Sequence, residues 1–325
     1  MLYAIINSKE SQAIQMKAFG IQSYGPPSVI QEYTKDEPIP KDNQVKIKVS
    51  AFAINPYDAS MRRGNFQDQR ALKFPYILGS DLVGKIVEVG TAVNDYQIGD
   101  FVINHRASGA YSEYVTATTA KIMPLPAGLD LAQAASLPTP GIAAYNAWHA
   151  FANIQSNDVI GIVGVGGAVG SLIAQIAHAA GHRVIGVAKG RHQELAKELQ
   201  VDQFIAYDQL PEEETWQHQA DVVFNTIFAG SDQHLSEQLV KENGQLVFFT
   251  GVPDDLNLPN VDTVAVGFRK DLKDADVFAF WSDFLAEHPL QLAVQQTFPF
   301  EQEAIVKAHE LIESHHQGKL VVWVN

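Results

Sequence analysis

The stretch DVIGIVGVGGAVGSLIAQIAHAAGHRVIGVA, residues 158–188, decides the fold of this chain. Its first part, residues 159–163, is a short, β-branched apolar run of the kind that forms a buried parallel strand. A glycine-rich turn follows, and apolar residues then recur at helical spacing as far as Gly181, where a helix would end. Residues 182–188 return to a second apolar strand. The stretch therefore predicts a βαβ unit whose first turn is rich in glycine.

A glycine-rich turn between a strand and a helix suits a dinucleotide. The backbone of such a turn can approach a pyrophosphate closely, and the helix N-terminus offers free N–H groups and partial positive charge. The spacing is Gly164-x-x-Gly167-x-x-Gly170 rather than a strict G-x-G-x-x-G. The flanking strands and helix supply the context that the motif requires, although a βαβ unit without a ligand is the alternative. The residues expected at the pyrophosphate are Gly164, Gly167, Ala168 and Val169.

The end of the second strand indicates which dinucleotide binds. Enzymes that use NAD usually carry Asp or Glu there, which bonds the ribose 2′-OH of the adenosine. This chain carries Lys189 and Arg191, and its first carboxylate comes only at Glu194. Two cations without an acid suit a 2′-phosphate, because both donate charge-assisted hydrogen bonds to it. We therefore expect NADP(H) as the cofactor; a solvated basic loop at the start of a helix is the alternative.

Length and composition set bounds on the rest. At 325 residues the chain exceeds the size at which one core keeps growing, so two domains are expected. The formal net charge of −14 argues against binding of nucleic acid or of an anionic membrane. The absence of cysteine excludes disulfides, thiolate zinc sites and a catalytic thiol. No apolar run is long enough for a transmembrane helix and no signal peptide is evident, so we expect a cytoplasmic protein.

The regions on either side of the glycine turn have different patterns. Residues from about 17 to 115 alternate strand patterns with glycine and proline turns, which predicts an antiparallel, barrel-like domain. A helical stretch at 130–151 follows, which we expect Pro138 and Pro140 to break. The clearest expected strands are 45–53, 82–89 and 100–103 before the turn and 220–224 and 245–249 after it. A final helix and strand, within residues 300–324, are expected to return to the first domain.

An ordered series of short motifs extends from Met16 almost to the end of the chain. It includes Asn55-Pro56-Tyr57-Asp58, Gly99-Asp100-x-Val102, Gly109-Ala110-Tyr111-Ser112-Glu113-Tyr114, the glycine turn, Phe298-Pro299-Phe300 and Gly318-Lys319. In this series the chain resembles the zinc-independent quinone oxidoreductases of the medium-chain dehydrogenase/reductase superfamily, the group that includes zeta-crystallin. The resemblance implies an α/β protein with a GroES-like β-barrel catalytic domain and a Rossmann-type, doubly wound parallel sheet domain. The expected boundaries are 1–126 and 268–325 for the first, with 1–15 as an N-terminal extension, and 127–267 for the NADP-binding domain.

Two positions at which zinc-dependent relatives hold their metal differ in this chain. Asn55 stands where they have the cysteine of Cys-x-x-Asp, and Ser80 where they have the histidine of Gly-His-Glu. Neither is a good zinc ligand, so we expect no catalytic metal. The reaction best suited to such a site is hydride transfer from NADPH to an electron-poor acceptor, which is a quinone or an α,β-unsaturated carbonyl (enone).

The resemblance also implies roles for single residues. Asn55 and Tyr57 would line the cleft near the nicotinamide, Asn55 as an amide donor and Tyr57 as a hydrogen-bond donor or proton source. Simple packing of the Tyr57 ring is equally open. An ion pair between Asp58 and Arg63 is expected to fix the loop. The remaining expected cofactor contacts are Thr139 and Gly251 at the nicotinamide half, Tyr207 near the adenosine, and Lys319.

Two other functions stay open. One is a zinc-free reductase of enoyl thioesters, for which Arg62, Arg63, Arg269 and Lys270 are the candidates to meet the phosphates of the carrier. The other is a non-enzymatic NADPH-binding or crystallin-like protein, against which the intact glycine turn weighs. The expected partners are a small electrophilic substrate and, by the resemblance, a second copy in a homodimer.

Overall fold

The computed structural model describes residues 13–105, 107, 109–209, 216–227, 234–314 and 318–324, and every statement below applies to these. The expected N-terminal extension falls almost wholly on residues 1–12, which lie outside the described residues. Among the described residues, no helix combines the length and the apolar character that crossing a membrane needs.

Six strands form an entirely parallel sheet in the order β11-β10-β9-β12-β13-β14. Counted from its first strand this is the order 3-2-1-4-5-6 of the Rossmann fold, as expected. The strands are β9 Val159–Val163, β10 Arg183–Ala188, β11 Gln203–Ala206, β12 Ala220–Asn225, β13 Val240–Phe248 and β14 Asp262–Ala265. The helices that accompany them are α4 Ala168–Ala179, α5 Gln193–Glu198 and α6 Leu235–Leu239. The predicted βαβ unit is thus β9, α4 and β10.

Both faces of the parallel sheet are buried, which explains its unbroken apolar runs. Ile160 and Phe224 belong to the core on the α4 side. Val187 and Val223 belong to the core on the other side, where α6 packs through Leu239. The site that such a sheet offers lies at the carboxyl ends of β9 and β12, because the strand order reverses between them.

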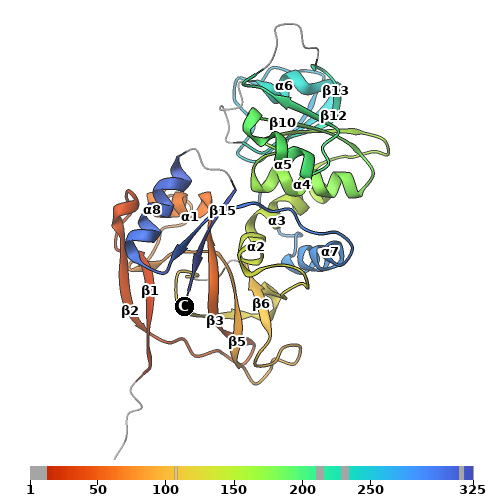
Figure 1. Cartoon of the computed structure of the whole chain (residues 1–325). Helices are drawn as coiled ribbons and strands as arrows, with labels where there is room; N and C mark the ends of the chain where they lie inside the picture. Colours follow the sequence, from red (N-terminus) through yellow and green to blue (C-terminus); the bar gives the residue numbers. More distant parts are fainter. Residues whose placement is uncertain are drawn as a thin grey trace, which may run out of the picture.

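The barrel domain is built from residues 15–124 and 294–323 and contains a seven-stranded and a three-stranded sheet, in the lower half of Figure 1. The larger has the order β15-β16-β3-β5-β6-β8 with β7 paired to β3, and the smaller is β2-β1-β4. All pairs are antiparallel except β15 with β16. The strands are β1 Gln15–Ile21, β2 Ile30–Asp36, β3 Gln44–Ile54, β4 Tyr76–Ile77, β5 Asp81–Val89, β6 Phe101–Asn104, β7 Tyr114–Thr118, β8 Ile122–Pro124, β15 Val294–Pro299 and β16 Lys319–Trp323.

Strand β3 changes the face that it turns to the barrel core. Val45 and Ile47 point into that core, and so does Phe52. In a regular strand Phe52 would lie on the face opposite to Ile47, because successive side chains alternate between the two faces. The pairing of β3 with β5 shifts by one residue between Val49 and Ala51. Such a bulge exchanges the two faces of a strand, so Ala51 comes to face the other core.

Three helices lie between the two sheets: α2 Leu131–Ser136, α3 Pro138–Asn146 and α7 Asp274–Glu287 (Figure 1). The helical stretch is interrupted before Pro138, as expected, but not at Pro140. The expectation for Pro140 was wrong because this residue lies in the first turn of α3, where a backbone N–H has no partner within the helix. Helix α7 packs on α3, where the Trp281 Nε1–H donates to the Gly141 carbonyl at 3.0 Å. One apolar core runs from Ala51 through these helices to Phe224.

The C-terminal segment returns to the barrel, as predicted. Strand β16 pairs antiparallel with β3, and α8 Gln302–Glu313 packs against α1 Pro56–Arg63. This return places Lys319, the first residue of β16, beside Asn55, which precedes α1.

Candidate active site

The glycine turn requires glycine at two places for different reasons. Gly164 has a φ of +90°, a left-handed conformation that side chains resist, and its N–H donates to the Val187 carbonyl at 2.9 Å. Gly170 has ordinary helical backbone, but a Cβ there would lie 2.4 Å from the Gly164 carbonyl oxygen. The turn and the start of α4 therefore touch through backbone alone, which fixes the helix N-terminus at the end of β9.

The first turn of α4 presents backbone N–H groups. Gly167 is its N-cap, and no side chain caps it. Gly167 is exposed, and Ala168 and Val169 are half-buried. The first N–H groups of a helix have no partner within the helix, and they carry its partial positive charge. The structure thus brings the expected pyrophosphate contacts together at the point where the strand order reverses.

The expected 2′-phosphate contacts gather at the ends of β10 and β11. Lys189 directly follows β10, and Arg191 lies in a single 3₁₀ turn, with its Nε 3.3 Å from His192 Nε2. Tyr207 joins them, because its N–H donates to the Ala188 carbonyl at 3.2 Å. Burial and Asp208 raise the pKa of Tyr207, against the opposing charge of Arg191.

Sequence reasoning missed Asp208 at this place. Its carboxylate accepts a hydrogen bond from the Gly190 N–H at 2.7 Å. The acid follows β11 rather than β10, so a search for an acidic residue at the end of the second strand could not find it. Pairing of β10 with β11, in which Ala188 faces Ala206, places the two ends side by side.

A cluster of polar side chains, buried except for the half-buried Thr139, lies where the barrel meets α3. Its members are Asn55, Asp58, Ser80, Asp81, His105, Thr139 and Lys319. Asp81 is its centre: its carboxylate accepts from Asn55 Nδ2 at 2.9 Å, from the Thr139 N–H at 2.9 Å and from the Thr139 Oγ1 hydroxyl at 2.8 Å. The His105 ring lies 3.2 Å away, and the Lys319 ammonium donates to Asn55 Oδ1.

The three charged groups of the cluster differ in how burial acts on them. Burial raises the pKa of Asp58 to about 7, against the hydrogen bond from the Asn55 N–H, and the Asp81 charge raises it further. Burial also acts to raise the pKa of Asp81, but the hydrogen bond and charge of His105, with Lys319 and Thr139, hold it below its usual value. Burial lowers the pKa of Lys319, and the two carboxylates oppose that change. Asp81 is therefore the constant negative charge of the cluster at neutral pH.

The two residues expected to be catalytic lie on opposite sides of the start of α1. Asn55 is 1 % exposed, and both its amide atoms are bonded within the cluster. Tyr57 is 42 % exposed. Its ring lies against that of Phe66, with centroids 5.5 Å apart, and its hydroxyl is 3.5 Å from Arg70 Nη1. Of the two, Tyr57 is the side chain that a substrate can reach.

The two residues expected at the nicotinamide half are placed differently. Thr139, at the start of α3, donates hydrogen bonds from both its N–H and its hydroxyl to the Asp81 carboxylate. Gly251 follows β13 with a φ of +99°, which favours glycine, and no heavy atom lies within 4 Å of a Cβ built there. Their contacts with a cofactor stay predictions, as does that of Lys319.

The expected ion pair between Asp58 and Arg63 was wrong. Asp58 instead accepts from the Asn55 N–H at 2.9 Å and from the Ser80 hydroxyl at 3.1 Å, while the Arg63 Nε lies 3.6 Å from Glu313. The N-cap position of Asn55 explains this, because a carboxylate three residues later bonds back to the N-cap N–H. Asp58 thus closes the helix start and faces inward.

Arg62 does not face solvent either, and it joins α1 to α8. Its side chain is fully buried, and it contacts Glu313 and the Gly25 carbonyl. Its Nε lies 3.4 Å from His309 Nδ1, and the other ring nitrogen of His309 is 3.0 Å from the Tyr111 hydroxyl. Burial and the charge of Arg62 lower the pKa of His309 to about 3, so this histidine is neutral.

Asp58 makes the stability of the protein depend on pH. Its pKa is about 7 when folded and 3.8 in its ordinary state. The stability that its proton contributes is complete below pH 3.8 and is lost as the pH rises through 7. His309 acts in the opposite direction, because its pKa falls from 6.5 to about 3 on folding. Its contribution is present above pH 6.5 and is lost as the pH falls toward 3.

The comparison of wild type with Asp58→Asn isolates the first group. The stability of the wild type relative to the variant is expected to fall by about 1 kcal/mol for each pH unit between pH 5 and 7. Urea unfolding at three pH values measures this, with Asp68→Asn in an exposed loop as the control. A difference that stays constant over this range would show that Asp58 does not titrate there.

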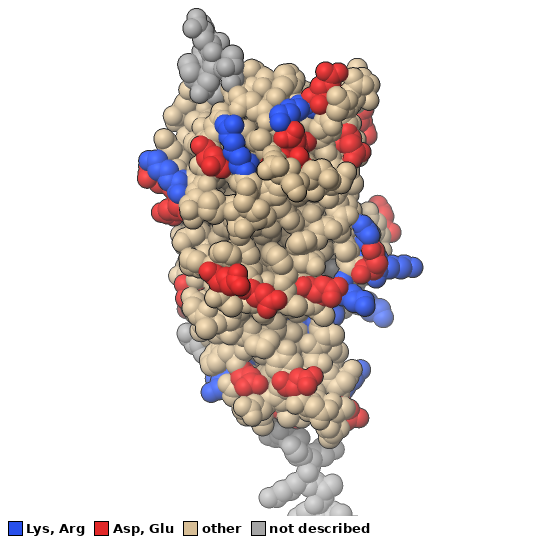
Figure 2. Space-filling model, turned by 90° about the vertical axis from the view of Figure 1, so that its right-hand side faces the viewer, with Lys and Arg blue, Asp and Glu red and all other residues tan. Residues whose placement is uncertain are grey.

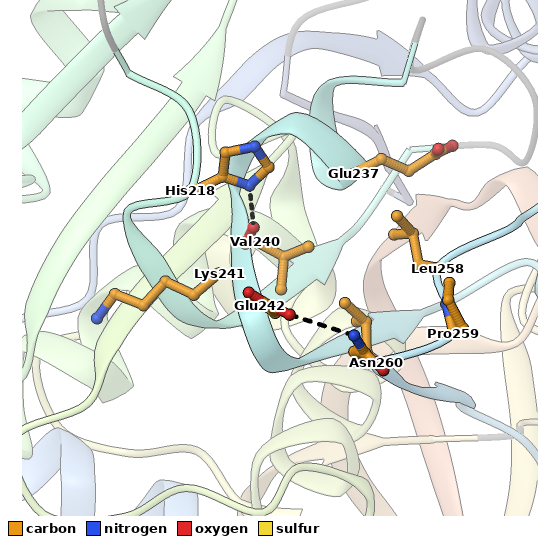
Figure 3. Close-up of a pocket in the computed structure, with 9 residues that line it drawn as sticks. His218, Glu237, Val240, Lys241, Glu242, Leu258, Pro259 and Asn260 are labelled. Carbon is orange, nitrogen blue, oxygen red and sulfur yellow. Dashed lines mark hydrogen bonds between the residues drawn. The ribbon is translucent and has the colours of Figure 1, made fainter.

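Two pockets lie at the amino ends of the strands of the parallel sheet, opposite to the glycine turn. One, of about 500 Å³, is lined by residues that include His218, Glu242 and Asn260, at the amino ends of β12, β13 and β14 (Figure 3). The other, of about 530 Å³, lies near Trp148, before β9 and β10. Ligands of parallel sheets bind at the carboxyl ends of the strands, so we expect the cofactor at the glycine turn and in neither of these pockets. The placement of the acceptor at Tyr57 also stays a prediction.

No metal site is evident at this place in the described residues. No three side chains of His, Asp or Glu gather there or elsewhere in the described part of the chain as metal ligands do. Asn55 and Ser80, at the positions of zinc ligands, are both bonded to carboxylates.

The chain matches two family models. Residues 41–127 match the model described as the alcohol dehydrogenase GroES-like domain, and residues 168–275 match the one described as zinc-binding dehydrogenase. The first contains strands β3 to β8 of the barrel, and the second contains α4 and strands β10 to β14. The GroES-like and Rossmann-type parts expected from the sequence are thereby confirmed.

Curated and solved relatives agree. The chain is 33% identical over 257 residues to the mitochondrial NAD(P)H oxidoreductase RTN4IP1 of Dictyostelium discoideum. The aligned region covers 73% of this chain and 72% of that protein. It is 35% identical to the human quinone oxidoreductase over 53% of each chain, and so spans about half the length of that relative. The structure of the quinone oxidoreductase from Coxiella burnetii, 28% identical, superposes with a TM-score of 0.79 over 96% of this chain and 100% of that one. The chain therefore belongs to the zinc-independent, quinone oxidoreductase type of the medium-chain dehydrogenase/reductase family.

Proposed function

We propose that this oxidoreductase transfers a hydride from NADPH to a quinone or an enone without a metal. The observation that carries the proposal is the uncapped start of α4 at the reversal of strand order, with Lys189 and Arg191 at the neighbouring strand end. The names of the relatives, NAD(P)H oxidoreductase and quinone oxidoreductase, support the same reaction.

The residues divide the work between binding and chemistry. The N–H groups of Ala168 and Val169 bind the pyrophosphate, while the Gly167 N–H donates to the Gly164 carbonyl at 2.9 Å and closes the turn. Lys189 and Arg191 bind the 2′-phosphate. When bound, NADPH supplies the hydride. Hydride addition leaves negative charge on an oxygen of the acceptor, and a hydrogen bond from an exposed hydroxyl stabilises that charge.

Tyr57 is the hydroxyl that this chain offers. It donates to the acceptor oxygen, and the proton that completes the reduction comes from this hydroxyl or from solvent. Asn55 acts behind it, because its amide joins the Lys319 ammonium to the Asp81 carboxylate and so holds the start of α1.

Asp208 lies beside the expected 2′-phosphate contacts. Its carboxylate is engaged by the Gly190 N–H at 2.7 Å. It therefore supports the loop that carries Lys189 and Arg191, while those two cations remain to meet a phosphate. One hydrogen bond leaves the carboxylate acceptor capacity for a ribose hydroxyl, so the preference for NADPH rests on the two cations and not on Asp208.

Replacement of Lys189 by alanine is expected to weaken NADPH binding by about 10- to 100-fold, because one charge-assisted hydrogen bond to the 2′-phosphate is lost. NADH binding should hardly change. Titration followed by nicotinamide fluorescence measures both. Lys197→Ala, which removes an exposed lysine paired with Glu194 in α5, is the control. Equal binding of the two cofactors by the wild type would refute the NADPH preference, and binding of neither would favour a non-enzymatic role.

The enoyl-thioester alternative keeps part of its sequence support. Arg62 is buried, Arg63 lies beside Glu313, and the Arg269 guanidinium is paired with Asp271 at 2.5 Å. Arg62 is therefore withdrawn from solvent, whereas Arg63 and Arg269 form exposed ion pairs that a carrier phosphate could replace.

The expected partners and location remain proposals. Figure 2 shows a face on which Asp and Glu side chains form a row and broad areas carry no charge, which accords with the net charge of −14 and with a small-molecule rather than nucleic-acid partner. We also propose that the protein forms a homodimer, as the family resemblance implies, and that it is located in the cytoplasm.

A further inference from the structure

The loop between α1 and β4, residues 64–75, is held on both sides of its tip. Near its start, the Phe66 carbonyl accepts from the Gln69 N–H at 3.1 Å and from the Arg70 N–H at 2.7 Å. Near its end, the Leu72 N–H donates to the Tyr24 hydroxyl at 2.9 Å. These bonds define the direction in which the loop presents its tip, and Arg70 lies there.

Arg70 lies against the side chain that we place at the acceptor. Its Nη1 is 3.5 Å from the Tyr57 hydroxyl, on the ring that packs against Phe66. Its charge also reaches Tyr76, because it opposes the rise that burial causes in the pKa of that phenol. The guanidinium thus lies near two tyrosine side chains at the exposed side of α1.

This guanidinium has no carboxylate partner in the part of the chain that the structure describes. Arg62 and Arg63 both pair with Glu313, and Arg269 pairs with Asp271. No ion pair of that kind is formed by Arg70. In a chain of net charge −14, a cation without a carboxylate partner beside the Tyr57 hydroxyl is a local site for an anion.

We propose that Arg70 makes the acceptor site selective for aromatic quinones that carry an anionic group, a carboxylate or a sulfonate, on or beside the reducible ring. The proposal rests on the proposed function and names its substrate class. A guanidinium binds such a group through two parallel N–H donors, a geometry that an ammonium cannot reproduce. The Phe66 and Tyr57 rings supply an apolar surface for the quinone. Arg70 would therefore orient the acceptor by its substituent, and Tyr57 would meet the oxygen.

The test compares two acceptors in two variants. Rates of NADPH oxidation are measured with menadione, which is neutral, and with 1,4-naphthoquinone-2-sulfonate. The ratio of kcat/KM for the sulfonate to that for menadione is expected to fall by about tenfold in Arg70→Met, mainly through KM, and to recover only in part in Arg70→Lys. Comparing variants removes the difference in reduction potential between the acceptors. Lys73→Met, which removes an exposed cation from the same loop, should keep the ratio of the wild type.

A binding measurement separates failure of this proposal from failure of the proposed function. Naphthalene-2-sulfonate cannot be reduced, and calorimetry gives its affinity for the wild type and for Arg70→Met in the presence of NADPH. Tighter binding by the wild type without turnover of either quinone would support Arg70 and overturn the quinone reaction. An unchanged ratio of kcat/KM, with menadione reduced, would overturn the role of Arg70 and leave the reaction standing.

Discussion

Replacement of Lys319 by methionine is expected to destabilise the folded protein by about 3–5 kcal/mol, because it removes a buried cation whose charge offsets that of buried carboxylates. The ammonium is buried against Asn55 Oδ1 and acts on the charges of Asp81 and Asp58. Methionine fills a similar volume but supplies neither the hydrogen bond nor the charge. Asp81 would then be left buried without the ammonium charge that lowers its pKa. Urea unfolding at pH 7.5 measures the loss.

The matched control for this change is Lys241→Met. The Lys241 ammonium lies 2.8 Å from both carboxylate oxygens of Asp221, but both side chains are about one-third exposed. Exposed pairs of this kind contribute about 0–1 kcal/mol. Similar small losses in both variants would show that Lys319 is not a charge on which the cluster depends. Reductase activity should fall with Lys319→Met even where the variant is folded, because Asn55 and the start of α1 lose an anchor.

The second large effect is expected at Gly170. In Gly170→Ala a Cβ would lie 2.4 Å from the Gly164 carbonyl oxygen and 2.9 Å from its carbon. Both are backbone atoms, so the start of α4 must move away from β9. Alanine normally favours a helix by about 1 kcal/mol over glycine, so a net loss of about 1–3 kcal/mol would report the clash.

Displacement of α4 also moves the N–H groups that would bind the pyrophosphate. Loss of two charge-assisted hydrogen bonds corresponds to roughly a 100-fold or larger weakening of NADPH binding. Fluorescence titration and thermal unfolding measure the two effects. Gly267→Ala is the control, because no heavy atom lies within 4 Å of a Cβ built there. Normal NADPH affinity in Gly170→Ala would contradict the placement of the cofactor at this turn.

Periodicity in the sequence was enough to locate the parallel sheet. The predicted strands 159–163 and 182–188 agree with β9 and β10 to within one residue. Helix α7 was missed, although Val277, Phe278 and Trp281 are spaced as on one buried helix face. These residues recur at positions i, i+1 and i+4, so the signal for this helix was present in the sequence.

The polar cluster could not be predicted in the same way. The contact between Lys319 and Asn55 joins residues 264 positions apart, and no local pattern encodes such a pair. Arg62 and Arg63 are adjacent and chemically identical, yet one is fully buried and the other is exposed. Which of them faces inward depends on the docking of α8 against α1, and hence on tertiary packing rather than on propensity.

The apolar core that runs from Ala51 through α2 and α3 to Phe224 limits how members of such a family can exchange parts. The helices between the two sheets pack against both of them, so side chains of both sheets belong to the same core. A hybrid made by joining the barrel of one relative to the nucleotide-binding half of another must therefore match side-chain volumes across that layer as well as the joint in the chain. Crossovers that keep α2, α3 and α7 from a single parent preserve this match, and those that divide them leave voids or overlaps.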